Sequence, residues 1–347
     1  TCLTTPHGCR RKRCALQNRC ELLVGAPPAG RSRASVAGMK FAFLPKPWTQ
    51  VVEDLETRGH QRVDLSDNPD MLLFRGGPDD FPDELPASVK VVQIAYAGIE
   101  ALLEAGVLRS HDVRWANAGG LYDDTVAEAT LALLLAVLHR HNAVKRSWNQ
   151  RELFEETEFL FNDAAAAETK TLALIGAGGI GKKLIQFIEP FGVEVTAVNR
   201  SGNPVEGAVR TVKMDEADDV WATHDFFVLL APLTEQTRHM VNAETLAKMK
   251  DTAVVVNVGR GGLIDTDALT NALQDGAIAG AGLDVTEPEP LPEDHPLWDI
   301  DTCVITPHTA NIPRYMKRRV GPLAAKNWEL FEAGEKMQTE VDVEAGY

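Results

Sequence analysis

The feature that most constrains this chain is a glycine-rich turn, GAGGIG at residues 176–181, which follows the apolar run Leu172–Ile175. A G-x-G-x-x-G turn between a strand and a helix is typical of a dinucleotide-binding βαβ unit. Gly176 would permit the tight turn, Gly178 would let the backbone approach a pyrophosphate, and Gly181 would let the helix pack closely on the strand. We expect the pyrophosphate to bind free N–H groups at the start of a helix that begins just after the turn; the alternative is a glycine-rich turn without a ligand.

Apolar runs alternate with helical patterns beyond this turn, which is the β-α-β rhythm of a parallel sheet. Six strands are expected there, the content of one complete doubly wound nucleotide-binding domain. They are Leu172–Ile175, Glu194–Val198, Phe226–Leu230, Val254–Val258, Gly280–Asp284 and Val304–Thr306.

The stretch before the turn shows the same alternation on a smaller scale. Expected strands are Phe41–Leu44, Met71–Phe74 and Val89–Ala95, and expected helices are Gln50–Arg58 and Gly98–Ala105. One long helix is predicted from Thr125 to about Trp148, and because its middle is apolar nearly all round, we expect it to be buried on more than one side. A last helix from about Pro313 is expected to cross back to the first domain.

Composition excludes several classes of protein. A length of 347 residues suits two domains of ordinary size. The net charge of −15 argues against a nucleic-acid partner, whose phosphates need a basic face. No apolar run reaches the roughly 18–20 residues that span a bilayer, and the best one, Leu131–Leu138, is typical of a buried helix. Beyond residue 38 the single cysteine is Cys303, which fits a reducing compartment such as the cytoplasm and leaves no cysteine cluster for a metal.

Residues 1–38 differ in kind from the rest, with seven basic side chains, one acid and four of the five cysteines. One interpretation is an Arg-rich leader of the kind that directs import into an organelle. The interpretation that we favour is upstream sequence translated by mistake, with Met39 as the true start. In both cases a basic segment poor in large apolar residues is expected to be disordered.

The end of the second strand of the nucleotide domain bears on the choice of cofactor. A carboxylate at this place would hydrogen-bond the ribose of NAD, but the sequence there is Asn199-Arg200-Ser201. The Arg200 guanidinium suits a 2′-phosphate, and its neighbours offer uncharged hydrogen bonds. The sequence therefore favours NADP(H) over NAD(H), although Arg200 as a solvated surface residue beside bound NAD is the alternative.

Three polar residues follow later strands of this domain, where loops border the ligand crevice of an open α/β sheet. They are Arg260, Glu289 and His308. A guanidinium can bind the carboxylate of a 2-oxo acid and polarise its carbonyl. A protonated histidine can supply the proton that the oxygen needs once a hydride has reached C2, and a carboxylate beside that histidine holds its orientation. Each residue alone could be an ordinary loop residue, so the prediction rests on their joint occurrence.

These stretches together resemble the D-isomer-specific 2-hydroxyacid dehydrogenase family, and the resemblance covers Met39 to about Asn327. The matching segments are residues 176–181, 231–234, 249–250, 257–261, 281–290 and 306–311. The resemblance implies hydride transfer between a nicotinamide and C2 of a small D-2-hydroxy acid or its 2-oxo acid, of the glyoxylate or hydroxypyruvate kind. It further implies that Arg260 binds substrate, Glu289 supports the histidine and His308 is the acid/base.

The resemblance also implies an α/β fold of two domains, a Rossmann-type doubly wound parallel sheet plus a smaller flavodoxin-like α/β substrate domain. The substrate domain would be residues 39–122 completed by 313–347, and the dinucleotide-binding domain residues 123–312. The long helix, which begins with Thr125 and Glu128, would link the domains and build a homodimer interface.

Further binding residues follow from the same resemblance. The implied cofactor site comprises Gly176, Gly178, Gly179, Ile180, Gly181, Asn199, Arg200, Ser201, Pro232, Thr237, Val258, Gly259 and Asp284. The implied substrate contacts in the first domain are Arg75, the backbone of Ala97 and Gly98, and Asn117.

The sequence departs from the family pattern in places. Lys182 and Lys183 stand where an arginine is more usual, and Glu100 replaces a common aspartate. The first domain is short, about 80 residues from Met39 to Gly119, and one helix or strand of the usual set is expected to be absent. We therefore expect the substrate pocket and the dimer contacts to differ from the family pattern more than the hydride chemistry does.

Other functions on the same scaffold remain open. Formate dehydrogenases carry an amide at the position of Glu289 and so resemble this chain less. A phosphite dehydrogenase keeps all three catalytic residue types. A dinucleotide-sensing corepressor would be a binding protein and would need a peptide groove in the first domain.

Overall fold

The computed structural model describes residues 38–145, 156–162 and 169–344. The expectation for residues 1–38 therefore lies outside the described residues, apart from Gly38.

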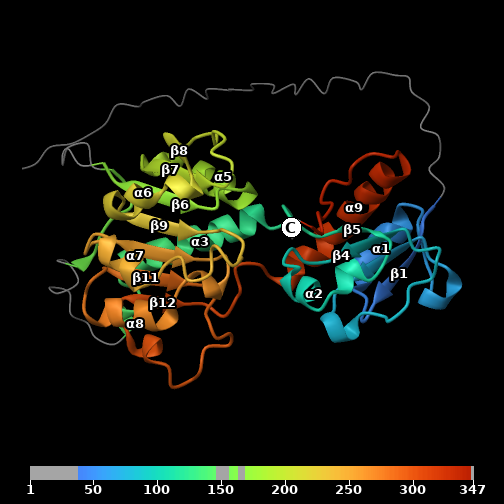
Figure 1. Cartoon of the computed structure of the whole chain (residues 1–347), viewed down its shortest axis with the longest axis horizontal. Helices are drawn as coiled ribbons and strands as arrows, with labels where there is room; N and C mark the ends of the chain where they lie inside the picture. Colours follow the sequence, from blue (N-terminus) through green and yellow to red (C-terminus); the bar gives the residue numbers. More distant parts are fainter. Residues whose placement is uncertain (1–37, 146–155, 163–168, 345–347) are drawn as a thin grey trace, which may run out of the picture. The chain divides into compact units, whose positions relative to one another are not determined.

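The first of two sheets lies in the amino-terminal part of the described chain (Figure 1, blue to cyan). Its five strands are all parallel, in the order β2-β1-β3-β4-β5. They are β1 (Lys40–Leu44), β2 (Gln61–Arg62), β3 (Met71–Phe74), β4 (Val91–Ile94) and β5 (Arg114–Ala116). Helices α1 (Thr49–Thr57) and α2 (Glu100–Glu104) connect them.

Both faces of this sheet are covered. In β3, Leu73 belongs to one buried apolar cluster, whereas Leu72 and Phe74 belong to another. Alternate side chains of a strand point to opposite faces, so an uninterrupted apolar run such as MLLF is what a sheet buried on both sides requires.

Two of these strands were not predicted. β2 consists of two exposed polar residues, and β5 has only three residues, so neither gives an apolar pattern. The first domain thus has two more strands than the sequence indicated.

The second sheet has seven parallel strands in the order β12-β11-β10-β9-β6-β7-β8 (Figure 1). They are β6 (Thr171–Ile175), β7 (Glu194–Asn199), β8 (Arg210–Lys213), β9 (Phe226–Leu229), β10 (Val254–Asn257), β11 (Gly280–Leu283) and β12 (Cys303–Ile305). The connecting helices include α5 (Gly179–Ile188), α6 (Asp218–Thr223), α7 (Ala243–Lys248) and α8 (Thr266–Gln274). Six strands match the prediction within one or two residues; the seventh, β8, was missed because only Val212 in it is buried.

Helix α3 (Asp123–Leu138) packs on α5 and across β10 and β11. Gly280 and Gly282 of β11 make this close approach feasible, since a Cβ on Gly280 would lie 2.6 Å from Cγ1 of Val137. The prediction that this helix runs to about Trp148 was wrong at its carboxyl end. Arg140 has a φ of 54°, a left-handed conformation that cannot continue an α-helix.

Helix α9 (Pro313–Glu332) packs against α1 of the first sheet. Two fully buried polar residues join it to β4, because Nδ2 of Asn327 donates to Oε1 of Gln93 at 2.7 Å. The chain then pairs Glu340 with Ala116 of β5. The carboxyl-terminal segment is thus bonded to the first sheet. No helix in the described ranges combines the length and the apolar character needed to cross a membrane.

Candidate functional site

The glycine turn 176–181 lies between β6 and α5 and has a different geometry at each glycine. Gly176 has a φ of 94°, and a Cβ there would lie 2.4 Å from the backbone nitrogen of Ala231. A Cβ on Gly181 would lie 2.8 Å from Cδ2 of Leu174, so the helix packs closely on β6. Next to Gly178, by contrast, no atom lies within 4 Å of such a Cβ. The middle glycine therefore borders open space, which fits a backbone that a pyrophosphate approaches. The helix begins at Gly179, earlier than predicted.

The residues at the end of β7 form a small turn of their own. Oδ1 of Asn199 accepts a hydrogen bond from the Gly202 backbone at 2.6 Å, and its Nδ2 donates to the Asn203 carbonyl at 3.0 Å. The Ser201 hydroxyl accepts from the Asn203 backbone. Arg200 is exposed between them. No carboxylate occupies positions 199–201, as the sequence showed.

The loop after β9 is closed on itself, since Oγ1 of Thr237 donates to the Pro232 carbonyl at 2.7 Å. The loop after β10 carries Val258, which is buried, and Gly259, whose N–H donates to Oδ1 of Asn257 at 3.1 Å. Both loops follow strand carboxyl ends, which is where the crevice of such a sheet lies.

His308 and Glu289 lie within hydrogen-bond distance, with His308 Nδ1 2.6 Å from Glu289 Oε1. About half of each side chain is exposed. Both line a cavity of about 330 Å³ that also includes Trp298 and Pro307. Because Nδ1 faces the carboxylate, Nε2 is the nitrogen left for exchanging a proton with a bound molecule.

The backbone of His308 is in the left-handed region, with a φ of 52°. A non-glycine residue there costs of order 1–3 kcal/mol and needs support from its surroundings. Asp284, at the end of β11, supplies that support: its carbonyl accepts from the His308 N–H at 2.8 Å. Its buried carboxylate accepts from the Thr306 hydroxyl at 2.6 Å and from the backbone of Thr309 and Ala310. These contacts hold the histidine loop.

Arg260 lies in a different cavity, of about 440 Å³, together with Asn117, Ile180 and Pro232. Its Nη1 donates to the Gly259 carbonyl at 2.8 Å and its Nε donates to Oε1 of Glu100 at 3.1 Å. Among the described residues, the hydrogen bonds of the Arg260 side chain go to Glu100 and Gly259, and that of the His308 ring goes to Glu289. The structure thus joins two of the three predicted catalytic side chains and leaves the third in a neighbouring cavity.

The predicted substrate contacts of the first domain divide in the same way. Ala97, Gly98 and Asn117 line the cavity of Arg260, and Nδ2 of Asn117 donates to the Ala97 carbonyl at 3.0 Å. Arg75 does not line it: its guanidinium lies over the Trp48 ring at 4.8 Å from the centroid and donates to the Lys46 carbonyl.

Glu287 is a residue of this region to which the sequence assigned no role. Its carboxylate lies 2.6 Å from Arg238 Nη1 and 2.5 Å from His239 Nε2. The hydrogen bond with His239, helped by Arg238, holds the pKa of the Glu287 carboxyl below its ordinary value. Glu287 thus ties the loop that carries Glu289 to the loop after β9. The sequence did carry a signal for Glu287, because the pair Glu287-Pro288 directly precedes the similar pair Glu289-Pro290.

In the described part of the chain, no three or more His, Cys, Asp or Glu side chains are grouped so that they could hold a metal ion.

Residues 131–310 match the family described as D-isomer specific 2-hydroxyacid dehydrogenase, NAD binding domain. The chain belongs to this family and is an NAD(P)-dependent 2-hydroxyacid dehydrogenase, an oxidoreductase with the two-domain α/β fold that the sequence predicted.

Among its relatives is an uncharacterized protein in the proB 3′ region of Corynebacterium melassecola, 52% identical over 311 residues, which are 89% of this chain and 100% of that protein. The human glyoxylate reductase/hydroxypyruvate reductase is 32% identical over 80% of this chain and 82% of its own length. The crystal structure of a D-isomer specific 2-hydroxyacid dehydrogenase from Xanthobacter autotrophicus Py2, in complex with NADPH and MES, aligns with a TM-score of 0.76 and 27% identity, covering 90% of this chain and 100% of that one.

Proposed function

We propose that this protein reduces a small 2-oxo acid, glyoxylate or hydroxypyruvate in kind, to the D-2-hydroxy acid with NADPH. The observation that carries the proposal is the pair formed by His308 and Glu289, 2.6 Å apart at the carboxyl ends of the parallel strands and open to a cavity. The name of the human relative, glyoxylate reductase/hydroxypyruvate reductase, supports the choice of substrate.

The cofactor would lie along the carboxyl edge of the second sheet. We assign its pyrophosphate to the backbone N–H groups at the start of α5, beside Gly178, where the structure leaves open space; the neighbouring Gly179 lies against the Asp123 carboxylate. Ile180, Pro232 and Thr237, with Val258 and Gly259, would border the rest of it. When bound, the nicotinamide supplies or accepts the hydride.

His308 would donate a proton to the substrate oxygen from Nε2 during reduction and take it back during oxidation. Glu289 would keep Nδ1 of the ring turned towards itself, and Asp284 would hold the loop. Arg260, with the Ala97–Gly98 backbone and Asn117, would bind the substrate carboxylate.

We further propose that residues 39–122 with 313–347 form the substrate domain and 123–312 the dinucleotide domain. The hydrogen bond between Asn327 and Gln93 supports this division. A homodimer through α3 is supported by the partly exposed apolar residues Leu131 and Leu135 on that helix.

The preference for NADPH rests on the sequence Asn199-Arg200-Ser201 at the end of β7, where Arg200 is exposed and none of the three residues is acidic. The test is the absorbance at 340 nm with glyoxylate and hydroxypyruvate, with NADPH or NADH as reductant. We expect kcat/KM to be higher with NADPH, and R200Q to lower it about tenfold for NADPH while leaving NADH nearly unchanged.

The matched control is R210Q on the neighbouring strand β8, where Arg210 pairs with Asp219 at 2.8 Å. It removes the same charge and should leave the ratio of the two cofactors unchanged. A preference for NADH would remove the argument from Arg200 but keep the reaction. Turnover with phosphite in place of every 2-oxo acid would replace the proposed substrate.

A further inference from the structure

The guanidinium that we assign to the substrate carboxylate already has a carboxylate partner from its own chain. Nε of Arg260 donates to Oε1 of Glu100 at 3.1 Å, and Nη1 donates to the Gly259 carbonyl. Roughly a third of each side chain in the ion pair is exposed, so a small molecule in the cavity can reach both.

The backbone beside this pair is shaped to accommodate it. A Cβ on Gly98 would lie 2.2 Å from Nη2 of Arg260 and 2.8 Å from Oε2 of Glu100. Any side chain at this position would therefore have to displace the ion pair. The hydrogen bonds to Gly259 and Glu100 use Nη1 and Nε, and Nη2 is turned towards Gly98.

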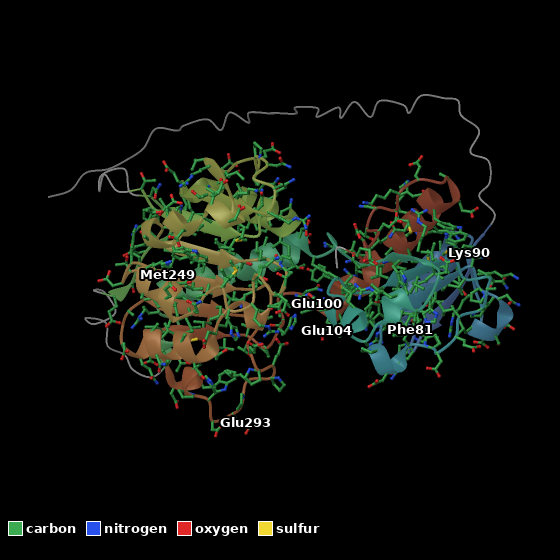
Figure 2. The ribbon with its side chains drawn as sticks, viewed as in Figure 1. Phe81, Lys90, Glu100, Glu104, Met249 and Glu293 are labelled. Carbon is green, nitrogen blue, oxygen red and sulfur yellow. The ribbon has the colours of Figure 1, made fainter. Side chains whose placement is uncertain are left out.

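The balance of charge in the cavity is negative. Among the described residues that line it, the charged ones are Glu100, Glu104 and Arg260. Glu100 and Glu104 stand at the two ends of α2 and are both labelled in Figure 2. The described lining of the cavity thus holds one guanidinium and two carboxylates, of which Glu100 is bonded to Arg260.

We infer that Glu100 is a specificity-determining residue, which shares Arg260 with the substrate and restricts the site to 2-oxo acids whose carboxylate is their only negative charge. A single carboxylate can take Nη2 and share the guanidinium with Glu100. A second negative group would enter a cavity whose one described cation is already shared, and it would meet like charge at short range. This inference rests on the proposed function, because it assumes that Arg260 binds the substrate carboxylate.

The test compares two anions of nearly equal size that differ by one charge, oxamate with one and oxalate with two. Neither is a substrate for reduction, so binding to the 347-residue chain with saturating NADPH can be measured by titration calorimetry. Wild type should bind oxamate more tightly than oxalate. In E100Q, oxamate should bind about threefold more tightly and the ratio of the two dissociation constants should narrow about tenfold, since one like charge near the anion is gone.

E104Q is the matched control, because it removes the same charge from the same helix and cavity, whereas the ion pair with Arg260 is made by Glu100. It should narrow the ratio by less than about threefold. Equal changes in the two variants would overturn the inference, since only the total charge of the cavity would then matter. Weaker binding of oxamate by E100Q would also overturn it, because Glu100 would then help Arg260 to bind.

Glyoxylate turnover by the same preparations separates this inference from the proposed function. Turnover by wild type together with equal changes in the two variants would leave the function standing and reject the role of Glu100. Binding of neither anion would reject the cavity as the substrate site and with it the role of Glu100. Fluorescence of bound NADPH verifies that each variant is folded.

Discussion

One loop of this protein carries two glutamates that each face a histidine, and the two pairs have different surroundings. Glu289 lies 2.6 Å from His308, and Glu287 lies 2.5 Å from His239. The first pair lines a cavity of about 330 Å³. Glu287 also binds Arg238, and its carboxylate is therefore divided between two partners.

The comparison shows that a histidine beside a carboxylate does not by itself define an acid/base site. The two pairs are alike in residue type, in distance and in partial exposure. They differ in what holds the histidine and in what it can reach. His308 lies on a loop that is hydrogen-bonded to the buried Asp284, and it borders a cavity. Glu287, by contrast, connects its own loop to the loop after β9 through Arg238 and His239.

The largest expected difference between the pairs is in catalysis. We expect H308N to lower kcat for glyoxylate about 10³-fold, within the usual contribution of a general acid or base. H239N removes the same group from the other pair and should lower kcat less than about fivefold. Both are measured as NADPH oxidation at 340 nm. Equal losses of kcat in H308N and H239N would contradict the assignment of His308, and not His239, as the acid/base.

The loop that carries Glu287 and Glu289 also packs against two neighbouring glycines, Gly261 and Gly262, which contact it in different ways. A Cβ on Gly261 would lie 1.9 Å from the Thr286 carbonyl oxygen, which belongs to the backbone of that loop. A Cβ on Gly262 would lie 3.1 Å from Oε1 of Glu287, the end of a flexible side chain. We expect G261A to lower the free energy of unfolding by about 2–3 kcal/mol, because the backbone must move.

G262A is the control for this substitution and should cost less than about 1 kcal/mol, because a side-chain end can give way. Urea denaturation of the two variants measures the difference. A loss in G262A as large as that in G261A would show that the close approach of the Thr286 backbone is not what sets the position of the loop.

The sequence predicted the regular parts of the molecule well, because they repeat a pattern. β3 was predicted at its observed bounds since its four apolar residues are buried, and the glycine turn was found from its spacing. β2 and β8 were missed because short strands at a sheet edge need few apolar residues. The early end of α3 depends on the left-handed Arg140, which the apolar pattern does not show.

The candidate site was predictable in its residue types but not in its contacts. Arg260, Glu289 and His308 each follow a strand, and the alternation of apolar runs with helical patterns predicts where those strands end. The ion pair of Arg260 with Glu100 joins residues 160 positions apart, and no local pattern indicates it. The Glu287-Pro288 pair makes Glu287 itself visible in the sequence, but its partners come from a loop about 50 residues earlier and no local pattern indicates them.

The smallest expected effect concerns pH and separates Glu287 from an ordinary surface carboxylate. His239 and Arg238 hold its pKa in the folded protein below the ordinary value of about 4.3. A carboxyl whose pKa is depressed by folding stabilises the fold above its unfolded pKa, and that contribution is lost as the pH falls through the folded pKa.

Because the pair is more than a third exposed, we expect E287Q to lower the free energy of unfolding by less than about 1 kcal/mol near pH 7, and this difference from wild type to shrink below about pH 4. E293Q removes an exposed carboxyl six residues further along the chain and serves as the control; Glu293 is labelled in Figure 2. Urea denaturation at several pH values measures both variants, and a cost of E287Q that stays constant down to pH 3 would show that the ion pairs of Glu287 contribute nothing to the stability of the loop.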